Sequence, residues 1–294
     1  MGGWWWHFPF KFKIINPPIL KFSPQKAKLQ VIEILSPIYG LEEAKAIANR
    51  LLILHFNIAL IDILTDKSLE QPDNWEEILF RLSNGEPFQY VIGKEFFHDH
   101  IFKVNQNTLI PRPETEELVD WILEDNKTDG LKILDIGTGT GVIPISLSDK
   151  RKNWEIHAWD ISEKALEIAN LNAENLGGEI HFQKMDALDI QSEEKFDIIV
   201  SNPPYVANFE KKDMKAHVLD FEPKLALFVE DNDPLLFYRK IIEFGITSLK
   251  PGGKIYFEIN PLFIAELEQL AENNNFLSLI RRDFRGKERM MRIQ

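Results

Sequence analysis

The sequence of 294 residues contains no cysteine, which excludes disulfides, thiol nucleophiles and cysteine-based metal sites. No apolar run reaches the roughly 18 to 20 residues that a membrane span requires. Positive charge is also scarce, because 46 acidic residues outnumber 34 basic ones and give a formal net charge of -12. A protein that binds mainly by neutralising phosphates needs clustered Lys and Arg, so the charge argues against that class. We therefore expect a soluble, cytoplasmic protein.

The first 28 residues are rich in aromatic and basic side chains and contain no acid. Pro9, Pro17 and Pro18 would break the helical core of a signal peptide, and no lysine precedes the aromatic cluster. We interpret residues 1–25 as an extension that is disordered or wrongly assigned. An arm that binds a membrane surface or a partner is the alternative.

Residues 26–87 show helical periodicity, with apolar side chains three and four positions apart from Leu41 to Leu52. Asp73 is a candidate N-cap for the segment NWEEILFRLSNG, and Gly85 is expected to end that helix. The pattern predicts a small helical domain.

Residues 88–113 change to alternating segments, YVIGKEFF and HIFKVNQNTLI, which predict a β-hairpin around His98, Asp99 and His100. These three residues are better explained as solvated residues of a hairpin tip than as a metal cluster. Pro111 to Glu117 then read as a rigid linker into a helix whose acidic first turn suits the helix dipole. Arg112 and Glu114 either fix this linker, line a cleft or belong only to the helix start.

From residue 114 to residue 294 we expect a single α/β domain. Strand and helix patterns alternate from Leu131 onward, which predicts βαβ units and a doubly wound, largely parallel sheet. The last two strands are joined by the short turn RGK and are expected to be antiparallel.

A glycine-rich loop, DIGTGTG, follows an apolar strand and opens a helix. Such a loop lets the backbone approach a nucleotide-type ligand, either a dinucleotide or S-adenosylmethionine. Asp160 ends the next strand, where it can accept hydrogen bonds from both ribose hydroxyls. Asp186 ends the third strand and is placed to receive an adenine amino group, with the backbone at Ala187 beside the ring and Ile161 available to pack on its face.

The fourth strand, FDIIVS, is followed by Asn202, Pro203, Pro204 and Tyr205. Two prolines remove two backbone donors and fix φ, so the Asn202 side chain is held rigidly at the sheet edge where open α/β sheets bind ligands. A proline-rich turn alone is the simpler alternative, and the upstream glycine loop disfavours it.

These motifs together resemble the class I S-adenosylmethionine-dependent methyltransferases, whose NPPY members methylate a nitrogen conjugated to a π-system. Such a planar NH2 is a poor nucleophile because its lone pair is delocalised. If Asn202 Oδ1 and the Pro203 carbonyl each accept one N–H, the nitrogen is aimed at the methyl group, and Tyr205 can pack on the flat amide. Groups that are aimed in this way contribute about 10²- to 10³-fold to the rate.

The wider sequence resembles the HemK/PrmC family of peptide chain release factor glutamine methyltransferases, through NGEPFQYVIGKEFF, LIPRPETEELV, NPPYV, FEPKLALF and RDFRGKERMM. This resemblance implies a seven-stranded sheet and a helical substrate-recognition domain, a glutamine substrate in a Gly-Gly-Gln loop, no metal and a monomer that requires no nucleic acid. It assigns cofactor contacts to Gly137, Thr138, Gly139, Thr140, Gly141, Asp160, Asp186, Ala187 and Asn202. It assigns the substrate amide to Asn202, Pro203, Pro204 and Tyr205, with Asn202, Pro203 and Tyr205 catalytic.

Three alternatives differ in the substrate or the activity. A related enzyme methylates a glutamine of a large-subunit ribosomal protein, but its linker typically reads PRSP where this chain reads PRPETE. An adenine methyltransferase of nucleic acids would share NPPY, but the chain has the wrong net charge and no Lys/Arg-rich recognition region beyond a basic cluster near residues 281–289. A non-catalytic scaffold is disfavoured by the intact NPPY. Ala187 departs from the family, in which the residue after the acid is often larger.

Overall fold

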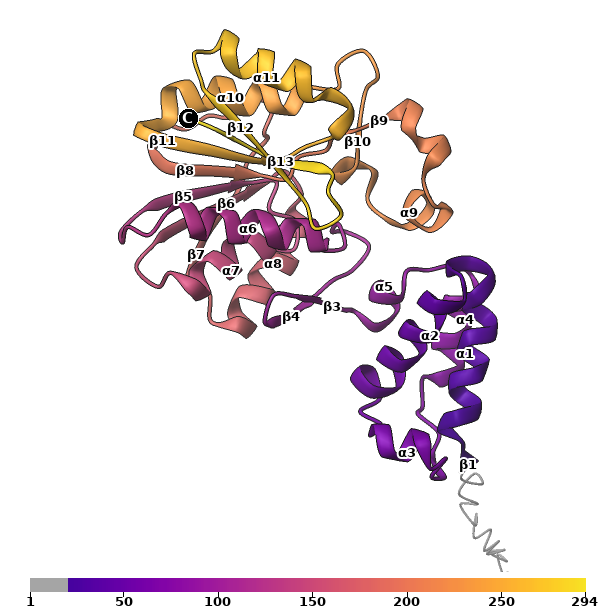
Figure 1. Ribbon diagram of the computed structural model, residues 1–294. Coiled ribbons are helices and arrows are strands. Elements are labelled where there is room, and N and C mark those ends of the chain that lie inside the picture. The colour runs from indigo at the N-terminus through magenta and orange to yellow at the C-terminus, as the bar shows by residue number, and fades with distance from the viewer. Residues whose placement is uncertain (1–20) are drawn as a thin grey trace, which may run out of the picture. The chain divides into compact units, whose positions relative to one another are not determined.

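The computed structural model describes residues 21–294, which divide into a first unit that ends at Gly85 and a second unit from Glu86 to Gln294 (Figure 1). The interpretation of the amino-terminal extension lies outside the described residues as far as residue 20. Strand β1 (Lys21–Phe22) and helix α1 (Pro24–Tyr39) follow at once, so ordered structure begins before residue 26. Across residues 21–294, no helix is both long and apolar enough to cross a membrane.

The first unit is a small helical bundle with a two-stranded ribbon. Ser23 caps α1 by accepting a hydrogen bond from the Lys26 amide at 3.2 Å. The apolar periodicity turns one side of each helix inward, and Trp75 packs edge-on against Phe22 with ring centroids 5.0 Å apart. Its elements after α1 are α2 (Leu41–Arg50), a π-helical turn (Leu51–His55), α3 (Leu60–Leu64), β2 (Leu69–Glu70) and α4 (Trp75–Ser83).

The prediction of Asp73 as an N-cap is wrong by one residue. The N-cap of α4 is Asn74, because a turn in which the Trp75 amide donates to the Pro72 carbonyl at 3.1 Å holds Asp73 before the helix.

The second unit opens with a helix where strand was predicted. Residues 88–92 form α5 (Phe88–Ile92), which starts after Pro87 and ends at Gly93 in the left-handed conformation with φ of 70°. Burial of Phe88, Tyr90 and Val91 outweighs the alternating pattern. The hairpin is therefore shorter than predicted and consists of β3 (Lys94–Phe97) and β4 (His100–Lys103), with His98 at the turn.

A seven-stranded sheet in the order β12-β13-β11-β8-β5-β6-β7 forms the centre of this unit, and all pairs are parallel except those that involve β13. This confirms the doubly wound class I methyltransferase fold. The strands are β5 (Lys132–Ile136), β6 (Glu155–Asp160), β7 (Ile180–Lys184), β8 (Phe196–Ser201), β11 (Leu249–Glu258), β12 (Ser278–Arg282) and β13 (Glu288–Ile293). Short strands β9 (Val206–Ala207) and β10 (Phe228–Val229) pair outside it, with α9 (Ala216–Phe221) between them.

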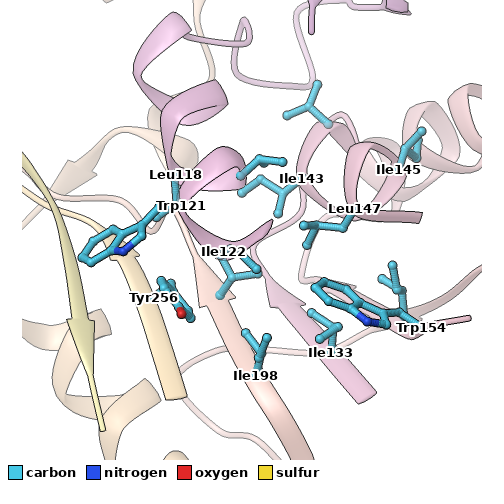
Figure 2. Packing of buried hydrophobic residues seen from close by; sticks show 14 of the residues in the cluster. Leu118, Trp121, Ile122, Ile133, Ile143, Ile145, Leu147, Trp154, Ile198 and Tyr256 are labelled. Carbon is cyan, nitrogen blue, oxygen red and sulfur yellow. The ribbon is translucent and has the colours of Figure 1, made fainter. Parts of the chain in front are cut away.

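Helices cover both faces of the sheet because successive strand residues point to opposite sides. On one face Ile133 and Ile198 pack with Trp121 and Trp154 (Figure 2), and on the other Leu134 joins a second cluster. The first face is covered by α6 (Pro113–Asp125), α7 (Val142–Lys150) and α8 (Glu163–Leu176), and the second by α10 (Leu236–Ser248) and α11 (Ile264–Asn273). The carboxyl ends of β5, β6, β7 and β8 thus meet at one edge, which places their loops around a common space.

Candidate active site

A cavity of about 320 Å³ lies at that edge of the sheet, entirely within the second unit. Most of the site residues expected from the sequence line it: Gly137, Thr138, Gly139, Thr140, Asp160, Asp186, Ala187, Asn202, Pro203 and Pro204. Gly141 and Tyr205 are not among the lining residues. Further walls come from residues 106–112, of which the sequence analysis had considered Arg112 for a cleft, and from Pro223, Leu225 and Ala226.

The glycine loop connects β5 to α7 and forms one wall. Gly139 has φ of 54°, in the region that glycine favours, and its amide donates to Asp160 Oδ2 at 2.9 Å. Gly141 has φ of 80°, and a Cβ there would lie 3.2 Å from the Cβ of Ala169. Gly141 therefore lets α7 begin close against α8, although it does not itself line the cavity.

Asp160 stands at the end of β6 and ties the loop to the strand. Its second oxygen, Oδ1, accepts the Ser162 amide at 2.8 Å, and burial raises the pKa of this carboxyl above its ordinary value. Each oxygen keeps capacity for another donor, as ribose binding would require. Asp186 Oδ1 accepts the Leu188 amide at 2.8 Å and thereby holds Ala187 in the cavity wall.

Two polar side chains, one near the end of β5 and one in the glycine loop, are buried without a hydrogen-bond partner within residues 21–294. Both carboxyl oxygens of Asp135 and the hydroxyl of Thr138 are in this state, and burial, together with the charge of Asp160, raises the pKa of Asp135 to about 7. Buried polar atoms ordinarily have partners. Thr138 lines the cavity, so its hydroxyl can meet a polar group of a ligand such as S-adenosylmethionine. Asp135 is fully buried and does not line the cavity.

Asn202 occupies the start of the NPPY segment, directly after β8. Its Nδ2 donates to Glu258 Oε2 at 2.8 Å and to Thr115 Oγ1 at 3.2 Å. A carboxylate can accept hydrogen bonds but cannot donate them. The donor Nδ2, and not the acceptor Oδ1, therefore faces Glu258. The amide is therefore fixed in one orientation, and Asn202 Oδ1 has no partner among the described residues while the side chain lines the cavity.

Glu258 is the residue that the sequence analysis missed most clearly. It ends β11, is 1% exposed, and accepts hydrogen bonds from Thr115 Oγ1 and from the Tyr205 hydroxyl, each at 2.7 Å. Burial raises the pKa of Glu258 above its ordinary value. The available signal was an acid at the end of the apolar strand KIYFE, which is unusual for a fully buried strand.

An ion pair closes the cavity on the side of the linker. Arg112 Nη2 lies 2.6 Å from Glu222 Oε1, and the Ile110 amide donates to Glu222 Oε2 at 3.3 Å. Glu222 is buried, and the attraction of its charge raises the pKa of Arg112 against the opposing effect of burial. Arg112 thus both lines the cavity and fixes the linker, whereas Glu114 lies 3.7 Å from Arg285.

Similarity to known proteins extends over most of the chain. The methyltransferase small domain family matches residues 115–221. The release factor glutamine methyltransferase of Flavobacterium psychrophilum is 41% identical over 276 residues, which cover 90% of this chain and 97% of that protein. Those of Bacteroides thetaiotaomicron and Lactococcus lactis are 43% and 44% identical, over 87% and 74% of this chain and 95% and 81% of theirs.

These matches cover 81 to 97% of the length of the three proteins. The chain therefore belongs to the family of release factor glutamine methyltransferases.

Proposed function

We propose that the protein transfers a methyl group from S-adenosylmethionine to the side-chain amide nitrogen of the glutamine in the Gly-Gly-Gln loop of class 1 peptide chain release factors. The observation that carries this proposal is the fixed amide of Asn202. Its oxygen has no partner among residues 21–294, and the side chain lines the same cavity as the buried Pro203 and the glycine loop. Membership of the family supplies the substrate class.

The residues of this chain divide into cofactor and substrate groups. In the proposal, Gly137 to Gly141, Asp160 and the Asp186 to Ala187 step hold the cofactor, which supplies an electrophilic methyl group when bound. Asn202, Pro203, Pro204 and Tyr205 hold the substrate amide. No metal takes part.

The chemical role of Asn202 follows from its single orientation. Asn202 Oδ1 and the Pro203 carbonyl each accept one N–H of the substrate amide, which fixes the NH2 plane and withdraws its lone pair from conjugation with the carbonyl. The nitrogen gains the methyl carbon as the methyl–sulfur bond breaks. It then loses one proton, which its new bond has made acidic, so the chain needs to supply no general base.

The proposal also assigns a role to the first unit. Large apolar side chains are exposed there, including Phe80 at 68% and Leu64 at 65%, as expected of a surface that recognises a protein. We assign substrate recognition to this helical unit, which the sequence analysis placed at residues 26–87, after the extension 1–25 and before the linker 88–113 and the catalytic domain 114–294. A cytoplasmic monomer that acts without nucleic acid completes the proposal.

The decisive experiment uses labelled S-adenosylmethionine with a recombinant release factor or with its Gln→Ala loop variant. We expect label in the wild-type factor alone, and equal label in both would refute the proposal. In the same assay Asn202→Ala should retain cofactor affinity within a few fold while turnover falls at least about 10²-fold. Gln183→Ala, an exposed change on β7, serves as the matched control with unchanged turnover.

A further inference from the structure

A cluster of metal-binding side chains lies at the opposite end of the sheet from the cavity, in the amino-terminal halves of β6 and β7. His157 and His181 are direct register partners on these neighbouring strands. Glu155 precedes His157 by two positions and therefore shares its face of the sheet. Each of the three residues offers one ligand atom, and these atoms all lie within 4.8 Å of one another.

We propose that Glu155, His157 and His181 bind one divalent transition-metal ion of the zinc type. Two imidazole nitrogens and one carboxylate oxygen are a donor set that zinc accepts, with water as the fourth ligand of a tetrahedron. Calcium and magnesium prefer oxygen ligands alone, so the two histidines favour zinc, nickel or copper over them.

The ligand atoms of the three side chains already lie close to the positions that binding of a cation requires. His157 Nε2 lies 2.8 Å from Glu155 Oε1 and donates a hydrogen bond to this oxygen in the tautomer that carries a proton on Nε2. Zinc binds imidazole nitrogen and carboxylate oxygen at about 2.0–2.2 Å. Replacement of that proton by the ion therefore requires the two side chains to separate only slightly, by rotation of groups that reach the surface. His181 is exposed, with its ring centroid 4.8 Å from that of His157, and can complete the site.

A supporting shell is present as well. Glu194 Oε2 lies 3.9 Å from His157 Nδ1, and histidine ligands commonly direct their second ring nitrogen to such a carboxylate. Lys132 bridges Glu155 and Glu194 at 2.8 and 2.6 Å. When the ion binds Glu155, Lys132 keeps its ion pair with Glu194 and therefore retains a charged partner.

The position of the site suggests what the ion does. Strand β7 is at the edge of the sheet and is paired only with β6. The chain leaves β7 directly into Asp186 and Ala187, which line the cavity. An ion that joins both strands would hold this edge strand in place, independently of the identity of the methyl acceptor.

The test is a calorimetric titration of the full chain with zinc chloride, after removal of any affinity tag, treatment with EDTA and dialysis. We expect one zinc ion per chain. His181→Ala should weaken binding at least about tenfold, and Glu194→Gln by about tenfold through loss of the supporting shell. Gln183→Ala lies on the same face of β7 two residues further on and should bind as the wild type does.

Thermal unfolding gives a second readout, because a ligand that binds only the folded state raises the melting temperature. Zinc should raise it for the wild type and for Gln183→Ala, and not for His181→Ala. Absence of binding by the wild type at millimolar zinc would overturn the proposal. Equal affinity and an equal thermal shift for His181→Ala would also overturn it, because the ion would then be bound elsewhere.

Discussion

Removal of Glu258 should disable the transfer of the methyl group while it leaves cofactor binding intact. The carboxylate accepts hydrogen bonds from Asn202 Nδ2, Thr115 Oγ1 and the Tyr205 hydroxyl, at 2.7 to 2.8 Å, and is 1% exposed. In Glu258→Ala nothing distinguishes the two ends of the Asn202 amide, so the side chain is free to turn its nitrogen toward the cavity. The NH2 group of Asn202 would then face the NH2 group of the substrate, and two donors cannot form a hydrogen bond with each other.

The size of the effect follows from the bond that sets the orientation. A hydrogen bond to a charged group contributes about 1.5–3 kcal/mol, which corresponds to a loss in kcat of about 10- to 150-fold. Glu258 does not line the cavity, so the affinity for S-adenosylmethionine should change by no more than a few fold. Single-turnover methylation of a release factor measures the first quantity, and calorimetric titration with the cofactor measures the second.

Glu258→Gln is the matched control. The side-chain oxygen of glutamine can replace Oε2 and accept from Asn202 and Thr115, while its NH2 donates to the Tyr205 oxygen. This variant should therefore retain most of the turnover that Glu258→Ala loses. If the two variants lose turnover equally, or if Glu258→Ala stays within twofold of the wild type, the orientation of Asn202 does not depend on Glu258.

Three further predictions concern other parts of the chain. Burial holds the pKa of Asp135 at about 7, above its unfolded value, so its stabilising contribution is present at low pH and is lost as the pH rises through 7. Urea unfolding without cofactor should show this loss at up to about 1.4 kcal/mol per pH unit between pH 4 and 7, and Asp135→Asn should remove the part that Asp135 contributes. Glu222→Gln should lower the free energy of unfolding by about 1–3 kcal/mol, since it removes the negative charge from the 2.6 Å pair with Arg112. The double change to Glu222→Leu with Arg112→Met should recover part of this loss. Phe80→Ser should raise the KM for a release factor about fivefold or more with kcat unchanged. An unaltered KM would show that Phe80 takes no part in recognition of the release factor.

The arrangement of the sheet could be predicted because its central strands β5, β8 and β11 contain apolar runs that alternate with helical periodicity. Such runs identify buried parallel strands without tertiary information. Where the prediction failed, packing decided the outcome. Residues 88–92 alternate like a strand, but they form α5 because three of their side chains are buried on one side of a helical turn. A pattern of five residues is too short to distinguish the two periods.

The cavity could be predicted for a topological reason. The glycine loop, Asp160, Asp186 and Asn202 each follow a strand, and parallel strands bring their carboxyl ends to one edge. The partners of these residues were harder to find. Thr115 and Glu258 are 143 residues apart, and neither belongs to a glycine loop or an NPPY segment. Hydrogen bonds between distant residues depend on strand register, which composition and spacing do not reveal.

Strand register brings Glu258 and Asn202 together. Strands β8 and β11 are parallel neighbours, and Phe257 is the register partner of Ser201. Glu258 follows Phe257 as the last residue of β11, and Asn202 follows Ser201 as the first residue after β8. Their side chains meet through the hydrogen bond from Nδ2 to Oε2 at 2.8 Å. An acid one residue past the register partner of the last residue of the strand before NPPY is thus a feature that can be sought in other chains once their strand register is known.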